Sequence, residues 1–433
     1  MRLAQRARAT VSAPWMPIAL LAVVSVLSLL ARAAWLSDPC ANPCKGETAH
    51  SLIFDELYYV NAARRIDGLA VPAKQPYAGD PAGQDSNSEH PQLAKLVIAG
   101  AIDVFGDGPF AWRIGSLLFG SMAILGMFAL ALAAGAGRWG ALLAATLMAS
   151  DNLLLVAGRI GTLDIYVVTF MIWAAAAYLR GRPLVAGVLL GLGATTKLVA
   201  PYLLLVIALI ELVRCRRGGL RIAARAYTEF TLMAVAVYFA VLAAFDRIAP
   251  PYDPQTGRTI TAGPLAHTQR MFAYAATQTS PHGPMGIASY PWDWLVDFKP
   301  INYLNVTVAS GSSRTATVHF LGLISPPILV LAIPALALAV RGAWGGLDVD
   351  ATALAWFLGT WLPFVALSLF WQRTSYLYYM VIVMPGIYLA LARAFTRPWM
   401  PRWILGGWLA TVLAAAVLAY PFLALPATNF WGA

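Results

Sequence analysis

Long apolar runs constrain this chain more than any other feature of its sequence. A membrane-spanning helix needs about 20 mostly apolar residues, and this 433-residue chain, with a mean hydropathy of +0.68, contains many such runs separated by short polar breaks. The sequence therefore predicts an all-α, polytopic membrane protein with eleven spans, or up to thirteen if some are built from half-helices. The predicted spans are residues 15–36, 109–135, 139–157, 162–180, 183–199, 200–214, 228–248, 317–340, 352–371, 376–395 and 402–424.

The first of these runs does not have the features of a cleaved signal peptide. It begins near Trp15, is too long for the apolar part of a signal peptide, and lacks a small-residue cleavage site. We therefore expect it to be a retained first helix.

The distribution of positive charge indicates how the helices are oriented. The net charge is +10, and arginine and lysine gather in polar breaks such as 214–226 and 393–402. This pattern is typical of cytoplasmic loops under the positive-inside rule, and it argues against nucleic acid as a partner. We therefore expect a plasma-membrane protein with its N-terminus in the cytoplasm and its C-terminus outside.

Two long breaks, residues 37–108 and 249–316, fall outside in this orientation. Loops longer than about 15 residues without clear structure are usually functional or disordered, and the tryptophan, histidine and paired charges here favour function. The breaks define three predicted regions: an N-terminal membrane region over 1–248 that includes the first external loop, the large external loop, and a C-terminal four-helix region over 317–433. Within the first external loop, the short apolar stretch 92–105 predicts a helix lying in the membrane interface.

Cysteine and histidine usage limits the chemistry. Cys40 and Cys44 fall in the first external loop, where they either form a disulfide or remain free thiols, whereas Cys215 lies in a cytoplasmic break and is expected to be reduced. The five histidines include no close pair, which argues against a metal site built on imidazole, although carboxylates can still bind a hard divalent ion. We expect no required cofactor, with a divalent metal as the open alternative.

The stretch "FDELYYVNAARR", residues 54–65, places two adjacent carboxylates, Asp55 and Glu56, in the first external loop. The apolar residues around them fall near helical spacing, which predicts an amphipathic interfacial helix with both acids in its first turn. One interpretation is structural, because acids in a first turn complement the helix dipole by about 0.3–1 kcal/mol. The other is that one of the two carboxylates acts as a catalytic base.

Several charged groups are predicted to lie at one depth, near the external face. Each costs about 2.5 kcal/mol or more at the centre of a bilayer, so they either pair with one another, as Arg159 and Asp164 can, or serve a function. Lys197 and Arg373 lie on non-neighbouring spans, and two such cations suit the phosphate of a lipid whose tail stays in the membrane. The polar residues at this depth are Arg113, Asp151, Asn152, Arg159, Asp164, Lys197 and Arg373.

The motif "SEHPQLAK", residues 88–95, adds a histidine and a lysine where the second interfacial helix begins. His90 before a proline at a helix start is either a turn feature or a site residue, and Lys95 is a further candidate for an anion. No glycine-rich phosphate loop with its lysine and no GxSxG motif is present in the sequence. Nucleotide hydrolysis and serine hydrolysis therefore have no support.

Taken in order, these motifs resemble the protein O-mannosyltransferases, a family of lipid-carrier-dependent GT-C glycosyltransferases. That family has an Asp-Glu pair in the first external loop, similar to Asp55–Glu56, followed by a His-Pro-Pro-Leu-Gly-Lys run, similar to residues 90–95. An arginine then opens the second span, as Arg113 does here. The remaining similarities are the "DN…R…LD" element with Asp151, Asn152, Arg159 and Asp164, the glycine-rich "GLGATTK" ending in Lys197, the large-loop pattern of 282–304, and the late element that contains Arg373.

The resemblance has departures as well. Gln92 and Ala94 stand where the family's run has proline and glycine, so the turn there is expected to differ. The soluble acceptor-side domain of eukaryotic members has no counterpart in this sequence, and the large external loop is short. These differences leave the sugar and the acceptor less defined than the reaction class.

The resemblance implies a GT-C membrane enzyme that transfers a sugar, with mannose expected, from a polyprenyl-phosphate carrier to Ser or Thr hydroxyls of exported proteins, with inversion at the sugar. It implies Asp55 as the base, with Glu56 holding the acceptor or the neighbouring backbone. The donor phosphate would be bound by cations, and three further residues would position the substrates. The predicted phosphate ligands are Arg113, Arg373, Lys95 and Lys197, and the predicted positioning residues are His90, Arg159 and Asp164.

Two other functions remain open on sequence. Related lipid-carrier glycosyltransferases share this architecture and modify glycolipids or cell-wall polymers. A transporter or flippase of an anionic lipid would use the same intramembrane cations. Such a protein has no need of an Asp-Glu pair on an external helix, and the inverted repeats common in transporters are not evident in this sequence.

Overall fold

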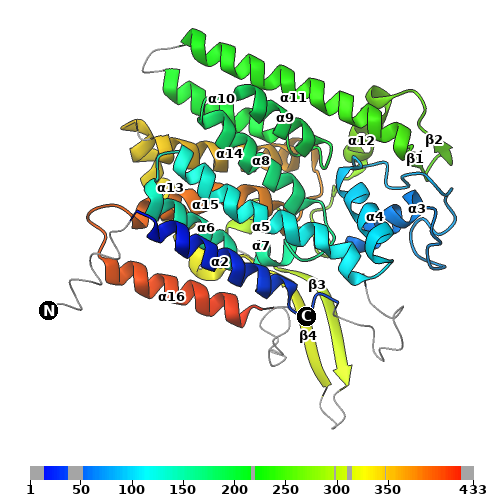
Figure 1. Cartoon of the computed structure of the whole chain (residues 1–433), viewed down its shortest axis with the longest axis horizontal. Helices are drawn as coiled ribbons and strands as arrows, with labels where there is room; N and C mark the ends of the chain where they lie inside the picture. The colour runs from blue at the N-terminus through cyan, green and yellow to red at the C-terminus, as the bar shows by residue number, and fades with distance from the viewer. Residues whose placement is uncertain are drawn as a thin grey trace.

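The computed structural model describes residues 14–37, 52–215, 220–296, 299–309, 315–346 and 348–420. Its helices lie side by side in a bundle, and short elements gather at one end of that bundle, on the right of Figure 1. The helices of the bundle are α2 (Met16–Ala33), α5 (Pro109–Ala133), α6 (Gly137–Ser150), α7 (Asn152–Ala157), α8 (Asp164–Leu179), α9 (Pro183–Ala194), α10 (Tyr202–Cys215), α11 (Leu220–Ile248), α13 (Pro326–Trp344), α14 (Asp348–Trp371), α15 (Met380–Phe395) and α16 (Arg402–Leu418).

The elements at the right-hand end come from the two predicted external loops. The first loop supplies the helices α3 (Glu56–Ile66) and α4 (Leu93–Phe105), which pack against each other. The large loop supplies β1 (Tyr252–Asp253), β2 (Arg258–Thr259), α12 (Pro264–Thr277) and the short 3-10 helix η2 (Asp293–Leu295). A second short 3-10 helix, η3 (Leu377–Tyr379), precedes α15.

Six helices are long and apolar enough to cross a membrane by length and composition, namely α2, α5, α11, α13, α14 and the helical stretch from η3 through α15. Shorter apolar helices, α8, α9 and α16, accompany them. Outward-facing side chains of α2 such as Val26, Leu27 and Leu30 are more than half exposed, as expected of a surface that faces lipid. The predicted multi-pass membrane fold is confirmed, whereas the predicted number of eleven spans is not.

Two of the predicted spans differ from the observed elements. The predicted span 139–157 is interrupted at Asp151, whose extended backbone separates α6 from α7. The predicted span 317–340 begins with part of strand β4 (Thr315–Gly322), and its helix, α13, starts only at Pro326. Ser325 occupies the N-cap position without a side-chain capping bond, and two prolines occupy the first helical turn, where a missing N–H costs nothing.

The strand β4 pairs with β3 (Ile301–Ala309) in an antiparallel ribbon that projects from the bundle (Figure 1). Its register runs from Ile301 opposite Gly322 to Ala309 opposite Thr315, with an irregularity between Asn302 and Leu304. The ribbon therefore crosses the predicted boundary at residue 316 between the large loop and the C-terminal region.

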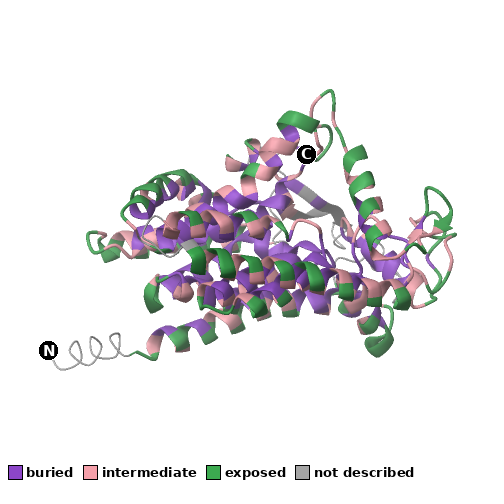
Figure 2. Ribbon diagram, turned by 90° about the horizontal axis from the view of Figure 1, so that it is seen from above, coloured by how far each residue is buried: buried purple, intermediate pink, exposed green. Residues whose placement is uncertain are grey.

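Close helix packing in the bundle depends on small residues. A side chain at Gly187 would lie 2.6 Å from the Phe230 carbonyl oxygen, and one at Gly191 would lie 2.8 Å from the Ala234 carbonyl oxygen. These two glycines, four residues apart on α9, let the backbone of α11 approach closely, which is a common device of membrane helices. Buried residues (purple in Figure 2) run through the middle of the bundle, and exposed ones line its outer faces.

The helix α3 is present where the sequence predicts it, but its buried face differs from the predicted one. Tyr58 is 43% exposed, whereas Tyr59 and Val60 are buried. The reason is that α3 packs on α4 and on the end of the bundle as well as facing outward. Cys40 and Cys44 lie outside the described residues, and Cys215 is a free thiol.

Candidate active site

Asp55 is a partly exposed carboxylate at the centre of the site. It precedes the first residue of α3 but makes no capping hydrogen bond to that helix. Within the described part of the chain, its carboxylate, which is only partly buried, has no hydrogen-bond partner. Asp55 thus does not cap α3 through its side chain, and its oxygens are available to a substrate. Its interpretation as a complement to the helix dipole stays a prediction.

The backbone before Asp55 is held in an unusual conformation. Phe54 has a φ of +53°, in the left-handed region that non-glycine residues rarely occupy. Its ring packs edge-on against Tyr303 at a centroid distance of 4.7 Å and against Tyr378 at 5.6 Å. Strained backbone of this kind tends to occur at functional sites, and here it turns the chain so that Asp55 enters the site.

The environment of Asp55 suits a base that works near neutral pH. Burial raises the pKa of the Asp55 carboxyl to about 7; the nearby positive charge of Lys197 lowers that pKa, and Asp164 raises it. A catalytic base is most effective when its pKa is close to the working pH.

Glu56, the second carboxylate of the pair, has a different role. It is fully buried, and both of its oxygens are held by Arg113, at 2.8 Å from Nε to Oε1 and 2.9 Å from Nη2 to Oε2. It also accepts hydrogen bonds from the backbone N–H of Ile53 at 2.7 Å and of Gly161 at 2.8 Å. These contacts agree with the expectation that Glu56 holds the neighbouring backbone. They do not agree with a direct catalytic role for Glu56, because neither of its oxygens faces solvent.

The same ion pair corrects the assignment of Arg113 to the donor phosphate. Its side chain is 1% exposed, and besides Glu56 it donates to the carbonyl oxygen of Leu36 at 2.6 Å. A guanidinium buried in this way ties α5 to the first turn of α3. It has no face toward a phosphate.

Lys197 and Asp164 form an ion pair beside Asp55, with 2.7 Å between Nζ and Oδ1. The Nζ atom also lies over the rings of Tyr378 and Tyr379, at 5.1 and 5.2 Å from their centroids. The alternative in which Asp164 pairs with Arg159 is therefore wrong. The cation at this point in the site is Lys197, as predicted, although a carboxylate already partly neutralises it.

Arg159 lies behind the site and contacts backbone. Its Nη2 atom donates to the carbonyl oxygens of Ala34 at 2.9 Å and Trp35 at 3.1 Å, and its side chain is buried. These bonds secure the end of α2. The predicted substrate-positioning role of Arg159 can therefore only be indirect, through the position of that helix.

His90 lies beside Tyr59 and near three positive charges. Its ring is 6.0 Å from that of Tyr59, centroid to centroid. Burial lowers the pKa of His90 well below its usual value, and neighbouring cations add to this effect. These cations are Lys197, Lys95 and Arg373. His90 is therefore a neutral imidazole at pH 7, suited to hydrogen bonding with a substrate.

Lys95 is a structural cation, which corrects its assignment to the donor phosphate. Its side chain is completely buried, with 2.5 Å between Nζ and Asp85 Oδ2. Nζ also donates to the carbonyl oxygens of Asn87 at 2.5 Å and His90 at 2.7 Å. With four oxygens around it, counting the Asn87 side chain at 3.4 Å, the ammonium has no donor left for a ligand. Lys95 instead shapes the turn that carries His90.

Arg373 is the cation most available to an anion. It lies between α14 and η3, follows Gln372, whose φ is +50°, and is partly buried. Its guanidinium donates to the carbonyl oxygen of Ala275, and no carboxylate of the described residues pairs with it. Its backbone bridges to Thr279, so the large loop holds it in place.

The large-loop motif is structural as well. The Trp294 indole donates to Ser289 Oγ at 2.9 Å, and Ser375 Oγ donates to the carbonyl oxygen of Ser289 at 2.9 Å. Lys299 donates to the carbonyl oxygen of Ala288 at 3.0 Å. These bonds join the loop to the segment that follows Arg373.

Sequence reasoning missed several groups near the site. Glu89 adjoins His90, burial raises the pKa of its carboxyl, and Tyr77 OH lies 3.4 Å from Oε1. Asp85 was missed too, although a lysine opening an apolar helix, as Lys95 does, signals the need for an acidic partner. The two other polar residues of the predicted cluster serve packing: Tyr388 OH donates to Asp151 at 2.9 Å, and Asn152 donates to the Leu321 carbonyl oxygen at 2.9 Å.

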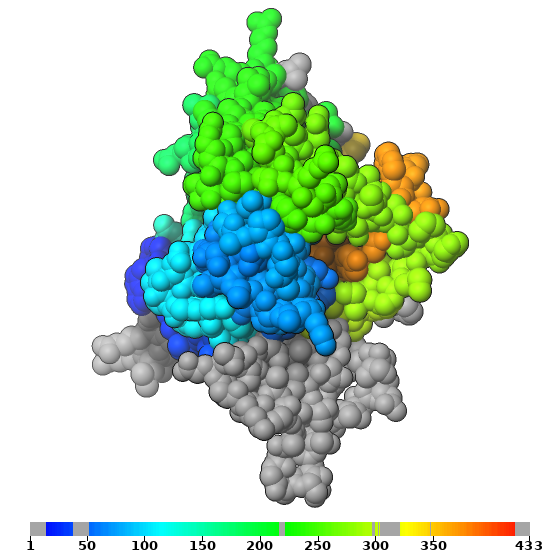
Figure 3. Space-filling view, turned by 90° about the vertical axis from the view of Figure 1, so that its right-hand side faces the viewer, coloured from blue at the N-terminus to red at the C-terminus, as the bar shows by residue number. Residues whose placement is uncertain are grey.

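These segments meet on the face of the molecule shown in Figure 3. There the first loop (blue) and the large loop (yellow-green) flank a recess in which the chain around residues 370–380 (orange) is visible. Among the described residues, no group of three or more His, Cys, Asp or Glu side chains is placed to hold a metal ion. At its centre, the described part of the site offers the available carboxylate of Asp55, a neutral imidazole and two cations of unequal availability.

Comparison with known proteins supports the predicted resemblance. Residues 89–244 match the family model described as dolichyl-phosphate-mannose-protein mannosyltransferase. A polyprenol-phosphate-mannose–protein mannosyltransferase from Corynebacterium glutamicum is 32% identical over 164 residues, which are 37% of this chain and 29% of that protein. The matched region thus spans less than a third of the length of this curated relative.

Solved structures show that the fold is shared over nearly the whole chain. The Saccharomyces cerevisiae protein O-mannosyltransferase Pmt1–Pmt2 complex bound to the sugar donor matches with a TM-score of 0.64 and 12% identity, covering 94% of this chain and 89% of that one. ArnT from Cupriavidus metallidurans bound to undecaprenyl phosphate matches with a TM-score of 0.55 and 18% identity, covering 94% and 64%. The Archaeoglobus fulgidus oligosaccharyltransferase matches at 0.58 and 13%, covering 96% and 57%. The chain therefore has the polytopic membrane fold of these solved structures, as predicted.

Proposed function

We propose that this protein transfers a sugar, with mannose the expected one, from a polyprenyl-phosphate carrier to Ser or Thr hydroxyls of exported proteins. The observation that carries the proposal is the available carboxylate of Asp55, set among Lys197, His90 and Arg373 at one end of the bundle. The fold likeness to a protein O-mannosyltransferase bound to its sugar donor, and the family match over residues 89–244, support the same reaction.

The base in this reaction is Asp55. Its carboxylate takes the proton of the acceptor hydroxyl while the hydroxyl oxygen bonds to the anomeric carbon of the sugar. The bond between that carbon and the phosphate oxygen breaks, and its electron pair leaves with the polyprenyl phosphate. Because attack and departure occur on opposite sides, the sugar inverts, and the proton on Asp55 passes to water afterwards.

The leaving phosphate is stabilised by the two cations at the site. Arg373 is the primary ligand, because its guanidinium has no acidic partner among the described residues and presents a planar fork to phosphate oxygens. Lys197 lies closer to Asp55 and adds positive charge there. Its charge is already partly neutralised by Asp164. We propose that no metal ion is required, since these cations supply the positive charge at the leaving group.

The remaining residues position these groups. Glu56 and Arg113 fix the start of α3 and so the place of Asp55. His90, as a neutral imidazole, donates or accepts a hydrogen bond to the sugar or the phosphate. Asp164 acts by holding Lys197 over the tyrosine rings.

We place this site on the outer face of the plasma membrane. The basic breaks at the opposite end of the bundle favour a cytoplasmic location for that end, with the N-terminus inside and the C-terminus outside. The acceptor would then be a protein during or after export, and the donor lipid would enter from the outer leaflet.

A second candidate is transfer of the sugar to a glycolipid or cell-wall polymer. The observation behind this candidate is the fold likeness to ArnT bound to undecaprenyl phosphate. The match to ArnT covers as much of this chain as the match to the Pmt1–Pmt2 complex does. Both candidates use the same base and the same phosphate ligands. They differ in the acceptor.

One experiment separates them. Membranes containing the protein are given polyprenyl-phosphate-mannose labelled in the sugar, and the label is followed into protein precipitates and into organic extracts. The proposal expects label in protein, released by β-elimination as expected of a Ser or Thr linkage. Label confined to lipid supports the second candidate, and no transfer to either class overturns both.

A further inference from the structure

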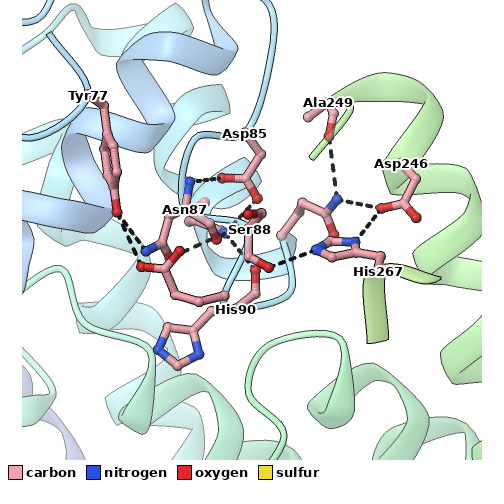
Figure 4. Close-up of polar contacts among 11 residues, drawn as sticks. Tyr77, Asp85, Asn87, Ser88, His90, Asp246, Ala249 and His267 are labelled. Carbon is pink, nitrogen blue, oxygen red and sulfur yellow. Dashed lines mark hydrogen bonds and ion pairs between the residues drawn. The ribbon is translucent and has the colours of Figure 1, made fainter. Parts of the chain in front are cut away.

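The turn that carries His90 is bonded to the large external loop by a buried histidine (Figure 4). His267 lies on α12 and is 0% exposed. Its Nδ1 atom is 2.8 Å from Asp246 Oδ1, near the end of α11, and its Nε2 atom is 3.1 Å from the carbonyl oxygen of Ser88. Three segments far apart in the sequence therefore meet at one imidazole ring.

The partners of this ring lie on opposite sides of it. A carbonyl oxygen only accepts hydrogen bonds, so the Nε2 atom of His267 donates to Ser88. The Nδ1 atom faces Asp246 Oδ1, and the ring therefore bridges the turn and the end of α11.

Gln92 joins the same arrangement from the first loop. Its Nε2 atom donates to Asp246 Oδ1 at 2.7 Å and lies 3.4 Å from the carbonyl oxygen of Ala249. Position 92 is where this sequence departs from the proline of the protein O-mannosyltransferase run. A proline has no side-chain donor and could not make this contact, whereas the glutamine found here does. We refer to Gln92, Asp246 and His267 as the clasp.

The clasp and Lys95 hold the two sides of one turn. The clasp fixes the carbonyl group of Ser88, and Lys95 fixes the carbonyl groups of Asn87 and His90. Glu89 and His90 belong to this turn, and His90 lies near the cations Lys197 and Arg373. The two residues are thus set by groups from α4, α11 and α12 together.

We propose that the clasp is a positioning device through which the large external loop sets the geometry of His90 and Glu89 toward the donor sugar. This inference rests on the proposed function, since the consequence for catalysis assumes that His90 meets the substrate. Asp246 and His267 are positioning residues in it, because they act through the turn. The clasp itself follows from the contacts alone.

Two variants test the clasp with little change of volume. Gln92→Met removes the donor to Asp246, and His267→Gln removes the imidazole ring but keeps one donor. Gln255→Met is the matched control, because Gln255 is exposed in the same large loop and its side chain contacts Arg270 instead. Each protein is assayed at full length in membranes, with rates expressed per folded molecule.

The expected kinetic result is a fall in kcat of about 10- to 100-fold for the clasp variants, because a displacement of about 1 Å at a reacting group costs that much. KM for polyprenyl-phosphate-mannose should change far less, since Arg373 is untouched, and Gln255→Met should match the parent. Combining Gln92→Met with His267→Gln should cost less than the product of the two effects, because both act on one carboxylate. Unchanged kcat in both single variants overturns the positioning role.

Hydrogen–deuterium exchange gives a readout that does not depend on turnover. Amides of residues 86–95 should exchange faster in His267→Gln and Gln92→Met than in the parent and in Gln255→Met. If exchange rises as expected while the parent transfers no sugar, the clasp stands and the proposed function fails. If exchange is unchanged, the clasp does not hold the turn and the inference is wrong, whatever the activity.

Discussion

The guanidinium of Arg113 holds the carboxylate of Glu56 at two points, with distances of 2.8 and 2.9 Å, and so joins α5 to the first turn of α3. Both side chains are almost completely buried. Glu56 therefore stabilises the structure around the site, whereas Asp55 is the proposed base. These two different roles can be tested.

Breaking this ion pair should destabilise the protein. Removing one partner of a buried pair leaves an uncompensated charge and costs about 3–5 kcal/mol. We expect Arg113→Met to lower the folded yield and the midpoint of thermal unfolding in detergent, measured by size-exclusion chromatography and a thermal shift assay. Arg113→Met combined with Glu56→Gln should recover part of the loss, because no buried charge then remains unpaired. An Arg113→Met protein as stable as the parent, but unable to bind donor, would instead return Arg113 to the phosphate site.

Arg373 should control the use of the donor. A hydrogen bond to a charged group contributes about 1.5–3 kcal/mol, so Arg373→Ala should lower kcat/KM for polyprenyl-phosphate-mannose by roughly 10- to 100-fold. Arg258→Ala, at an exposed position of β2, is the matched control and should leave that parameter unchanged. Equal kcat/KM values for Arg373→Ala and the parent would mean that another group binds the phosphate.

The pH dependence of transfer should follow Asp55. Its pKa is raised to about 7 in the folded protein, and the base must be deprotonated to accept a proton. The value of kcat/KM should therefore rise with pH through about 7 and level off above it. Lys197 lowers this pKa, so Lys197→Met should move the rise to higher pH. A profile that is flat between pH 5.5 and 8.5 would exclude Asp55 as the base.

Asp55 should make the folding stability fall with rising pH, whereas it makes the transfer rate rise. Because the folded-state pKa of Asp55 lies above the unfolded-state value of 3.8, the unfolded state releases this proton first as the pH rises. The stability of the folded state therefore decreases between about pH 4 and pH 7 and stays at the lower level above that. Asp55→Asn should thus unfold at a higher temperature than the parent at pH 8 and differ little at pH 4. Thermal unfolding at the two pH values measures this, and a destabilised Asp55→Asn at pH 8 would show that the carboxylate has a structural partner.

The orientation of the protein in the membrane can be tested with two cysteines. In a background in which Cys40, Cys44 and Cys215 are replaced by serine, a cysteine at Gln255 should react with an impermeant thiol reagent in intact cells. A cysteine at Arg221 should react only after the membrane is opened. The reverse pattern would invert the topology and move the site to the cytoplasm.

The apolar runs were sufficient to predict the helical bundle, because a run of about 20 apolar residues has few alternatives to a membrane helix. The prediction from apolar runs was wrong at Asp151, where extended backbone divides one run, and at β4, where a strand begins another. The average hydropathy of both runs stays high, so it does not reveal these interruptions. The sequence also placed Asp55, His90, Lys197 and Arg373 in one region, since each lies at the same end of its predicted span or loop.

The partner of each buried charge was not predictable from the sequence. Asp164 is five residues from Arg159 along the chain, yet it pairs with Lys197, 33 residues further on. Lys95 similarly pairs with Asp85 in a turn whose shape depends on His267, far away in the large loop. Such pairings are set by how helices and loops pack together, and the residue types alone allow several of them.

The most direct test of the account is the rate of sugar transfer by Asp55→Asn. The substitution keeps the shape of the side chain but removes its ability to take a proton, and a general base typically contributes about 10²–10⁴ in rate. At saturating acceptor and pH 8, Asp55→Asn should transfer labelled mannose at least 100-fold more slowly than the parent while still binding polyprenyl-phosphate-mannose, whereas Asp103→Asn, at an exposed position of α4, should match the parent. Transfer by folded Asp55→Asn at a rate near that of the parent would contradict the central claim, because the available carboxylate would then play no part in the chemistry.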